Sequence, residues 1–290
     1  MNFKEVLLVV NPISGHTDKK RIISEVQERL KMEDTGFHLY STTDENDREE
    51  IKSLIEEKNI DRVLVAGGDG TINLVAEVVK DFDLTLGVIA AGSANGLAVN
   101  LDLPDELTEQ IDVALGKNYM DLDILCLNGI ICLHMSDLGI NAELIMNYES
   151  SSLRGKFGYL IQSIPTLIQS EFPFQFRIET EKCTKDASAV LLAFANANKY
   201  GTGANVNPKG APDDGIFEIL VFKKLSLGDI LKTLRNETDL DPDFIEIIPA
   251  TKAKVTCLKP VSFQVDGEYI GKETEIEIKI LPEKLRIAIP

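Results

Sequence analysis

The feature of this sequence that most constrains its fold is a regular succession of apolar runs and amphipathic stretches in residues 1–125. Val6–Val10, Arg62–Ala66 and Leu84–Ala90 are mostly apolar runs of strand length, and apolar residues recur at helical spacing after each of them. Strands that are apolar on both faces and alternate with helices are typical of a parallel sheet with both faces covered. We therefore expect an α/β domain with a parallel sheet over residues 1–122.

The pattern changes to a period of two after about residue 120. Ile124–Leu127 and Ile130–Leu133 flank Asn128-Gly129, the kind of dipeptide that two-residue hairpin turns favour. Alternating apolar residues return at 174–178 and 276–280. These segments predict a second, mostly antiparallel β domain over residues 123–290, and we leave open that its last strands return to the first domain.

The charge of the chain excludes one class of partner. Its 290 residues carry 30 basic and 47 acidic side chains, a net charge of −17, of which −13 falls in residues 1–125. A nucleic-acid-binding protein needs a basic face to displace counterions, so we expect no nucleic-acid partner. No apolar run approaches the ~18 residues of a membrane span, and the four cysteines form no CxxC pair. A cytoplasmic protein with reduced cysteines is the expectation.

Three glycine-rich turns, Asn11–Gly15, Gly67–Thr71 and Gly92–Gly96, each follow a predicted strand and precede a predicted helix. In a parallel sheet such turns share one edge, where ligands of open α/β sheets bind. Glycine lets backbone N–H groups approach an anion, and helix N-termini favour negative charge, so the turns predict a phosphate site. Each turn alone is also an ordinary turn former. Neither GxxxxGK[ST] nor GxGxxG is present.

Two acidic positions leave alternatives open on the residues alone. Asp69 lies within the second turn, where a magnesium ion could bridge its carboxylate to phosphates, or where it could cap the helix that follows. Asp266-Gly267-Glu268 reads by itself as an ordinary hairpin turn.

These motifs together resemble the diacylglycerol kinase catalytic-domain family of lipid kinases, of the soluble bacterial type related to sphingosine and ceramide kinases. The resemblance runs from end to end of the chain. Its motifs are Asn11-Pro12-x-Ser14-Gly15, Gly67-Gly68-Asp69-Gly70-Thr71 with Asn73, Gly92-Ser93-x-Asn95, and Val265-Asp266-Gly267-Glu268.

The resemblance implies an ATP-dependent kinase with a C-terminal β-sandwich domain and an active site between the domains. The catalytic residues it implies are Asp69 and Glu268, with Glu268 as the general base that takes the proton of a lipid hydroxyl. The residues implied to contact ATP are Asn11, Pro12, Ser14, Gly15, Thr42, Gly67, Gly68, Asp69, Gly70, Thr71, Asn73, Gly92, Ser93 and Asn95.

A structural Mg²⁺ site in the β domain is also implied by the resemblance. Its ligands would be the side chain of Asp214 and the backbone carbonyls of Ala211 and Ile216, since hard cations take oxygen ligands. The alternative is a simple turn before the strand Ile216–Phe222.

Two positions depart from the family pattern. His16 replaces the usual basic residue after the first turn, and Gly96 replaces an acid frequent in diacylglycerol kinases, which leans towards the sphingoid-kinase branch. Asp121 matches another family acid that could compensate. These departures motivate one alternative, an inactive nucleotide- or lipid-binding regulator. NAD kinase is the other, because that family shares the Gly-Gly-Asp-Gly signature.

The partner implied is a lipid substrate, diacylglycerol or a related lipid such as a sphingoid base, reached by transient association with a membrane surface. Apolar residues in the stretch 153–168 could line an acyl-chain pocket or form a buried helix. A homodimer is expected from the resemblance alone.

Overall fold

The computed structural model describes residues 3–13, 15, 17–142, 173–200, 203–224, 232–233, 235 and 241–290. The chain divides into two compact units, Met1–Leu122 with Pro282–Pro290, and Asp123–Leu281. The apolar stretch 153–168 lies outside the described residues. Among the helices that the structure describes, none is long and apolar enough to cross a membrane.

The first unit contains a parallel sheet, as the strand pattern predicts. Its strands lie in the order β4-β3-β1-β2, and the end of β16 (Glu268–Ala288) pairs in parallel with β4, where Ile287 lies opposite Leu86. The other strands are β1 (Glu5–Val10), β2 (Gly36–Ser41), β3 (Arg62–Gly67) and β4 (Thr85–Ala90).

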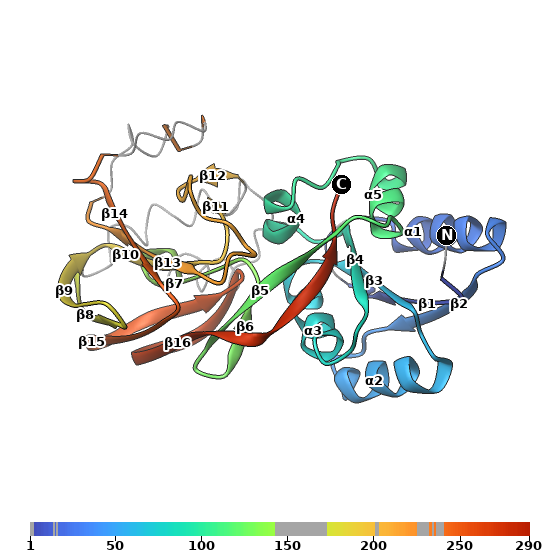
Figure 1. The fold of residues 1–290 in the computed structure, drawn as a ribbon, viewed down its shortest axis with the longest axis horizontal. Helices are drawn as coiled ribbons and strands as arrows, with labels where there is room; N and C mark the ends of the chain where they lie inside the picture. Colours follow the sequence, from blue (N-terminus) through green and yellow to red (C-terminus); the bar gives the residue numbers. More distant parts are fainter. Residues whose placement is uncertain are drawn as a thin grey trace. The chain divides into compact units, whose positions relative to one another are not determined.

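Helices cover both faces of this sheet, with α1 and α5 on one side and α2 and α3 on the other (Figure 1). Val6 and Leu8 pack with Ile22, Val26 and neighbouring helical residues in one buried cluster. Every residue of Val6–Val10 is at most 1% exposed, which is why the strand is apolar on both faces. The helices are α1 (Lys19–Met32), α2 (Asp47–Lys58), α3 (Asp69–Val79), α4 (Gly96–Asn100) and α5 (Leu107–Ala114).

The second unit is built from antiparallel pairs in the order β14-β13-β10-β7-β15-β16, with β8 paired to β15 and β9 paired to β8. Figure 1 shows these strands in green, yellow, orange and red. Their bounds are β5 (Tyr119–Leu127), β6 (Ile130–Cys132), β7 (Met135–Gly139), β8 (Phe174–Thr180), β9 (Thr184–Ala189), β10 (Leu191–Ala195), β11 (Lys199–Tyr200), β12 (Ala204–Asn205), β13 (Phe217–Phe222), β14 (Ile245–Ala250) and β15 (Lys252–Val265).

Strand β15 organises the unit because its two halves have different partners. Ala253–Cys257 pairs with β8, whereas Phe263–Val265 pairs with β7, and an irregularity in the β16 pairing separates the two halves. Inward-facing residues of both halves, such as Val255 and Phe263, join one buried apolar cluster. The fold class expected from the sequence is confirmed, and so is the hairpin of β5 and β6 around Asn128-Gly129.

Candidate functional site

The first glycine-rich turn is tied to the second by Asn11. Its side-chain Nδ2 donates to Oγ1 of Thr71 (3.2 Å), and its backbone N–H donates to the carbonyl of Ala66 at the end of β3 (3.2 Å). Its Oδ1 accepts the N–H of Ile13 (3.0 Å), which bends the chain immediately after β1. Asn11 therefore fixes the shape of its own turn and its distance from the Gly67–Thr71 turn.

Glycines let the three turns approach more closely than any side chain would allow. A Cβ on Gly15 would lie 2.4 Å from the carbonyl oxygen of Ala91, and Gly15 has a φ of +57°. A Cβ on Gly92 would lie 2.3 Å from Cα of Gly68. The three turns at the carboxyl ends of β1, β3 and β4 are thus packed backbone against backbone.

Replacing Gly92 by alanine is expected to push the second and third turns apart. Because the obstacle at Gly68 is backbone, we expect a loss of about 1–3 kcal/mol in the free energy of unfolding. We also expect weaker ATP binding. Urea denaturation and ATP titration of Gly92→Ala measure both quantities, with Ala94→Ser at an exposed position of the same turn as control. Unchanged stability and affinity in Gly92→Ala would contradict this packing.

The carboxylate of Asp69 joins the second turn to the third. Oδ2 accepts the N–H of Gly96 (2.9 Å) and Oδ1 accepts the N–H of Leu97 (3.1 Å), both in the first turn of α4. The alternative that Asp69 caps its own helix is wrong, because α3 begins at Asp69 and Gly68 occupies the N-cap position. Since each oxygen accepts a backbone N–H of α4, Asp69 holds that helix in place.

The third turn is closed by Asn95, which has a φ of +56°. Its Oδ1 accepts the N–H of Gly92 (2.8 Å), and its Nδ2 donates to the carbonyl of Gly92 (3.2 Å). Lys19 at the start of α1 reaches the same turn, where its Nζ donates to the carbonyl of Ala91 (2.7 Å). Burial lowers the pKa of Lys19. Lys19 is not among the residues expected to contact ATP, because a lysine at the start of a helix is equally typical of a solvated helix face.

The other residues expected to contact ATP lie in or beside the same turns. Thr42 follows β2, is buried, and donates its N–H to the carbonyl of Val10 (2.9 Å). Ser93 is exposed, whereas Asn73 is half-buried in α3. Pro12 lies within the first turn and Gly70 at the start of α3, and Ser14 and His16 are outside the described residues.

The Asp266-Gly267 turn connects β15 to β16 in the second unit, and both residues have positive φ, as two-residue hairpin turns of the I′ type require. Asp266 is buried, and its carboxylate accepts three backbone N–H groups, from Leu133 (2.8 Å), His134 (3.0 Å) and Met135 (2.8 Å). The motif is therefore a hairpin turn, as its residues alone indicate, but one anchored to the chain between β6 and β7.

Glu268 is the first residue after this turn and lies opposite Val265 in the β15–β16 register. It is exposed, so its carboxylate can reach a ligand. Glu268 belongs to the second unit, whereas Asp69 belongs to the first.

The loop expected to bind a structural cation precedes β13. Oδ1 of Asp214 accepts the N–H of Ile216 (2.9 Å), and Oδ2 of the buried Asp123 accepts the N–H of Gly215 (2.6 Å). Burial raises the pKa of Glu218, and the negative charge of Asp214 raises it further. Acidic side chains therefore surround this loop.

A cation at this loop would also need backbone oxygens. Within the described ranges, no group of three or more His, Cys, Asp or Glu side chains is placed to hold a metal ion. A carboxylate from Asp214 with the carbonyls of Ala211 and Ile216 gives an all-oxygen donor set, which is the chemistry that Mg²⁺ prefers.

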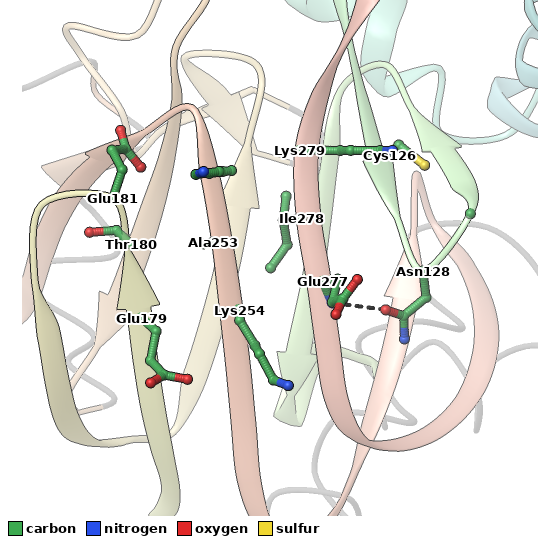
Figure 2. A pocket seen from close by; sticks show the side chains of 12 residues that line it. Cys126, Asn128, Glu179, Thr180, Glu181, Ala253, Lys254, Glu277, Ile278 and Lys279 are labelled. Atoms are coloured by element: carbon green, nitrogen blue, oxygen red, sulfur yellow. Dashed lines mark hydrogen bonds between the residues drawn. The ribbon is translucent and has the colours of Figure 1, made fainter.

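A groove with a volume of about 680 Å³ crosses β8, β15, β16 and the β5–β6 turn (Figure 2). The N–H of Glu277 donates to Oδ1 of Asn128 (2.8 Å) at one side of it. Three lysines and three glutamates line the groove, so its charges balance and do not favour an anion. None of the expected site residues is among its lining residues. The charged residues are Lys252, Lys254, Lys279, Glu179, Glu181 and Glu277.

Comparisons with known proteins identify a domain family for each half of the chain. Residues 5–127 match the diacylglycerol kinase catalytic domain, and residues 137–289 match the YegS C-terminal NAD kinase beta sandwich-like domain. The chain belongs to the diacylglycerol kinase catalytic-domain family of lipid kinases, with a C-terminal domain of the YegS type. The resemblance drawn from the motifs is confirmed.

Relatives match over nearly the whole chain. The diacylglycerol kinase of Bacillus subtilis (strain 168) is 24% identical over 277 residues, covering 92% of this chain and 91% of that protein. The probable lipid kinase YegS of Salmonella dublin is 24% identical over 297 aligned positions, covering 100% and 97%. A crystal structure of a putative diacylglycerol kinase from Bacillus anthracis str. Sterne has a TM-score of 0.81 at 22% identity, covering 100% and 97%, which shows the shared fold.

Proposed function

We propose that this chain transfers the γ-phosphate of ATP to the hydroxyl group of diacylglycerol or of a related lipid such as a sphingoid base. The observation that carries the proposal is membership of a lipid kinase family, together with three glycine-rich turns packed at the carboxyl ends of β1, β3 and β4. Such turns present backbone N–H groups to phosphates.

In this proposal the first unit binds ATP. Asn11, Gly15, Gly68 and Gly92 shape the phosphate-binding surface, and Asp69 keeps the third turn in register with the second. Because phosphoryl transfer depends on positioning of the reacting groups and on electrostatic stabilisation, the fixed geometry of these turns would favour the transfer. Magnesium bound with ATP would supply charge neutralisation at the phosphates.

Glu268 is proposed as the general base in the second unit. Its exposure and its place directly after an anchored turn suit a carboxylate that must meet a substrate hydroxyl in a defined position. The lipid would approach from a membrane surface. Residues 126–290 carry only −4 of the net charge of −17, which weakens repulsion by anionic lipids.

A structural Mg²⁺ ion at Asp214, with the carbonyls of Ala211 and Ile216, is also proposed. At a magnesium concentration of ten times Kd, binding would add about 1.4 kcal/mol to stability, which corresponds to a rise in Tm of about 3 °C. We expect this rise in the wild type and in Asp213→Ala, and its loss in Asp214→Ala. A wild-type melting temperature that does not respond to magnesium would argue against the site.

One assay tests the proposed function against both alternatives. The chain is incubated with magnesium and ATP labelled in the γ-phosphate, and with diacylglycerol, sphingoid bases, lysolipids or NAD in separate reactions. Label in a lipid is expected. Label in NAD alone would instead identify an NAD kinase, and label in no acceptor, with ATP still bound, would identify an inactive regulator.

A further inference from the structure

Asp137 on β7 is a fully buried carboxylate that the proposed function does not use. Its Oδ2 accepts hydrogen bonds from Nδ2 of Asn141 (2.7 Å), from Nε2 of Gln264 (2.5 Å) and from the hydroxyl of Tyr200. Its Oδ1 accepts the N–H of Ala142 (3.1 Å). Donors from β11, β15 and the chain after β7 therefore converge on one side chain.

Gln264 connects this carboxylate to the turn that precedes Glu268. Its Nε2 donates to Asp137, and its Oε1 accepts the N–H of Gly267 (2.7 Å). Ser136 also fixes its backbone, because Oγ of Ser136 donates to the Gln264 carbonyl (2.5 Å). A side-chain amide has one donor end and one acceptor end. A carboxylate that only accepts therefore dictates that the oxygen of Gln264 faces Gly267.

We propose that Asp137 is a positioning residue for Glu268, acting through Gln264 and the N–H of Gly267. The proposal rests on the proposed function, in which Glu268 is the general base. Asp137 touches neither substrate nor ATP in this account. Asp137 sets the orientation of the Gln264 amide, and this amide holds the Asp266-Gly267 turn in place. The turn in turn positions Glu268.

Burial makes the charged form of the Asp137 carboxylate costly in free energy. Burial outweighs the hydrogen bonds and raises the pKa of Asp137 to about 6. Because the folded-state pKa lies above the ordinary value of 3.8, the free energy of unfolding falls as pH rises through the window from about 4 to about 6. At neutral pH the ionised carboxylate is thus less favourable for folding than its protonated form would be.

The surroundings of Asp137 limit what else titrates there. Its cross-strand neighbours are Ala193 on β10 and Gln264 on β15, which carry no charge. Among the described residues that donate to it, Tyr200 is the ionisable one. Protonation of Asp137 adds an O–H donor to a carboxyl group that four donors surround, and so weakens its hold on the Nε2 group of Gln264.

Two variants and their combination test the proposal on the full chain. Gln264→Met removes the link to Gly267 and is expected to lower kcat roughly tenfold or more, with KM for ATP within about twofold. Asp137→Asn is expected to lower kcat by a smaller factor, because a neutral amide oxygen accepts less strongly. The double variant should have the same kcat as Gln264→Met alone, since Asp137 affects Glu268 only through Gln264 in this proposal. Gln175→Met, at an exposed glutamine of β8, is the matched control.

Two readouts distinguish positioning from a structural role. The wild-type kcat should fall as pH drops through about 6, the pKa of Asp137, and Asp137→Asn should lack that step. Asp137→Asn should unfold at no lower urea concentration than the wild type at pH 8. If Gln264→Met does not fold, the kcat and pH profile of Asp137→Asn decide. Unchanged kcat in a folded variant, or additive losses in the double variant, would overturn the inference alone, whereas an inactive wild type would overturn the proposed function with it.

Discussion

Replacing Glu268 by glutamine is expected to lower the rate of phosphoryl transfer to lipid by roughly 10²–10⁴-fold, the range typical of a lost general base. Glutamine has nearly the shape of glutamate but cannot accept the proton of the lipid hydroxyl. The residue follows an anchored hairpin turn and is exposed, so the substitution leaves the packing of β15 and β16 intact. ATP binding by the turns of the first unit should stay within about twofold of the wild type.

Single-turnover kinetics with lipid in mixed micelles, together with calorimetric ATP titration, measure the two quantities separately. Glu273→Gln, which removes a carboxylate from the same strand, is the control and should keep near-normal turnover. Near-normal turnover in Glu268→Gln would remove Glu268 as the base. A parallel loss of ATP binding would point instead to a role in nucleotide binding.

Replacing Asp266 by alanine is expected to reduce the free energy of unfolding by roughly 3 kcal/mol or more, because each buried N–H left unsatisfied costs about 1–3 kcal/mol. The carboxylate of Asp266 is the acceptor for three of them, on Leu133, His134 and Met135. Alanine also adopts the positive φ of this position less readily than aspartate does. Release of the turn should lower turnover as well, since the next residue but one is Glu268.

Urea denaturation of Asp266→Ala, followed by circular dichroism, measures this loss. Asp186→Ala, on β9, is a suitable control because the carboxylate of Asp186 is exposed and its ion pair with Arg177 is long (3.7 Å). We expect that control to change stability by less than about 0.5 kcal/mol. A similarly small effect in Asp266→Ala would show that the turn does not depend on its anchor.

The parallel sheet of the first unit could be predicted because its local signals agree. Val6–Val10 is buried on both faces, and the residues after it recur at helical spacing because α1 packs on the sheet. The β5–β6 hairpin could also be predicted from the sequence, since Asn128-Gly129 specifies its turn. In these segments a short stretch of sequence contains the information that determines the structure.

Strand β7 could not be predicted in this way. Ser136 and Asp137 are polar yet buried, so Met135–Gly139 shows neither alternation nor an apolar run. The partners that satisfy Asp137 lie 63 residues away at Tyr200 and 127 residues away at Gln264. Only the tertiary structure brings such partners together, and the sequence pattern therefore gives no sign of them.

Part of the candidate site could likewise be predicted from the sequence, and part could not. The glycine-rich turns and Glu268 belong to short motifs and could be proposed from the sequence, and their roles stay predictions. Asp69 contacts Gly96 and Leu97, which lie 27 and 28 residues further along the chain, and helix-capping rules applied to its own helix gave the wrong partner. The anchoring of Asp266 on the chain after β6 likewise depends on long-range pairing.

Mass spectrometry of the lipid product formed from ATP with isotopically labelled γ-phosphate oxygens tests the proposed lipid kinase activity. We predict that the wild-type chain converts diacylglycerol or a sphingoid base into its phosphomonoester. The transferred phosphoryl group should carry the labelled oxygens, and the ester oxygen should come from the lipid hydroxyl. A phosphorylated NAD without any phosphorylated lipid, or no phosphorylated product while ATP is bound, would contradict it.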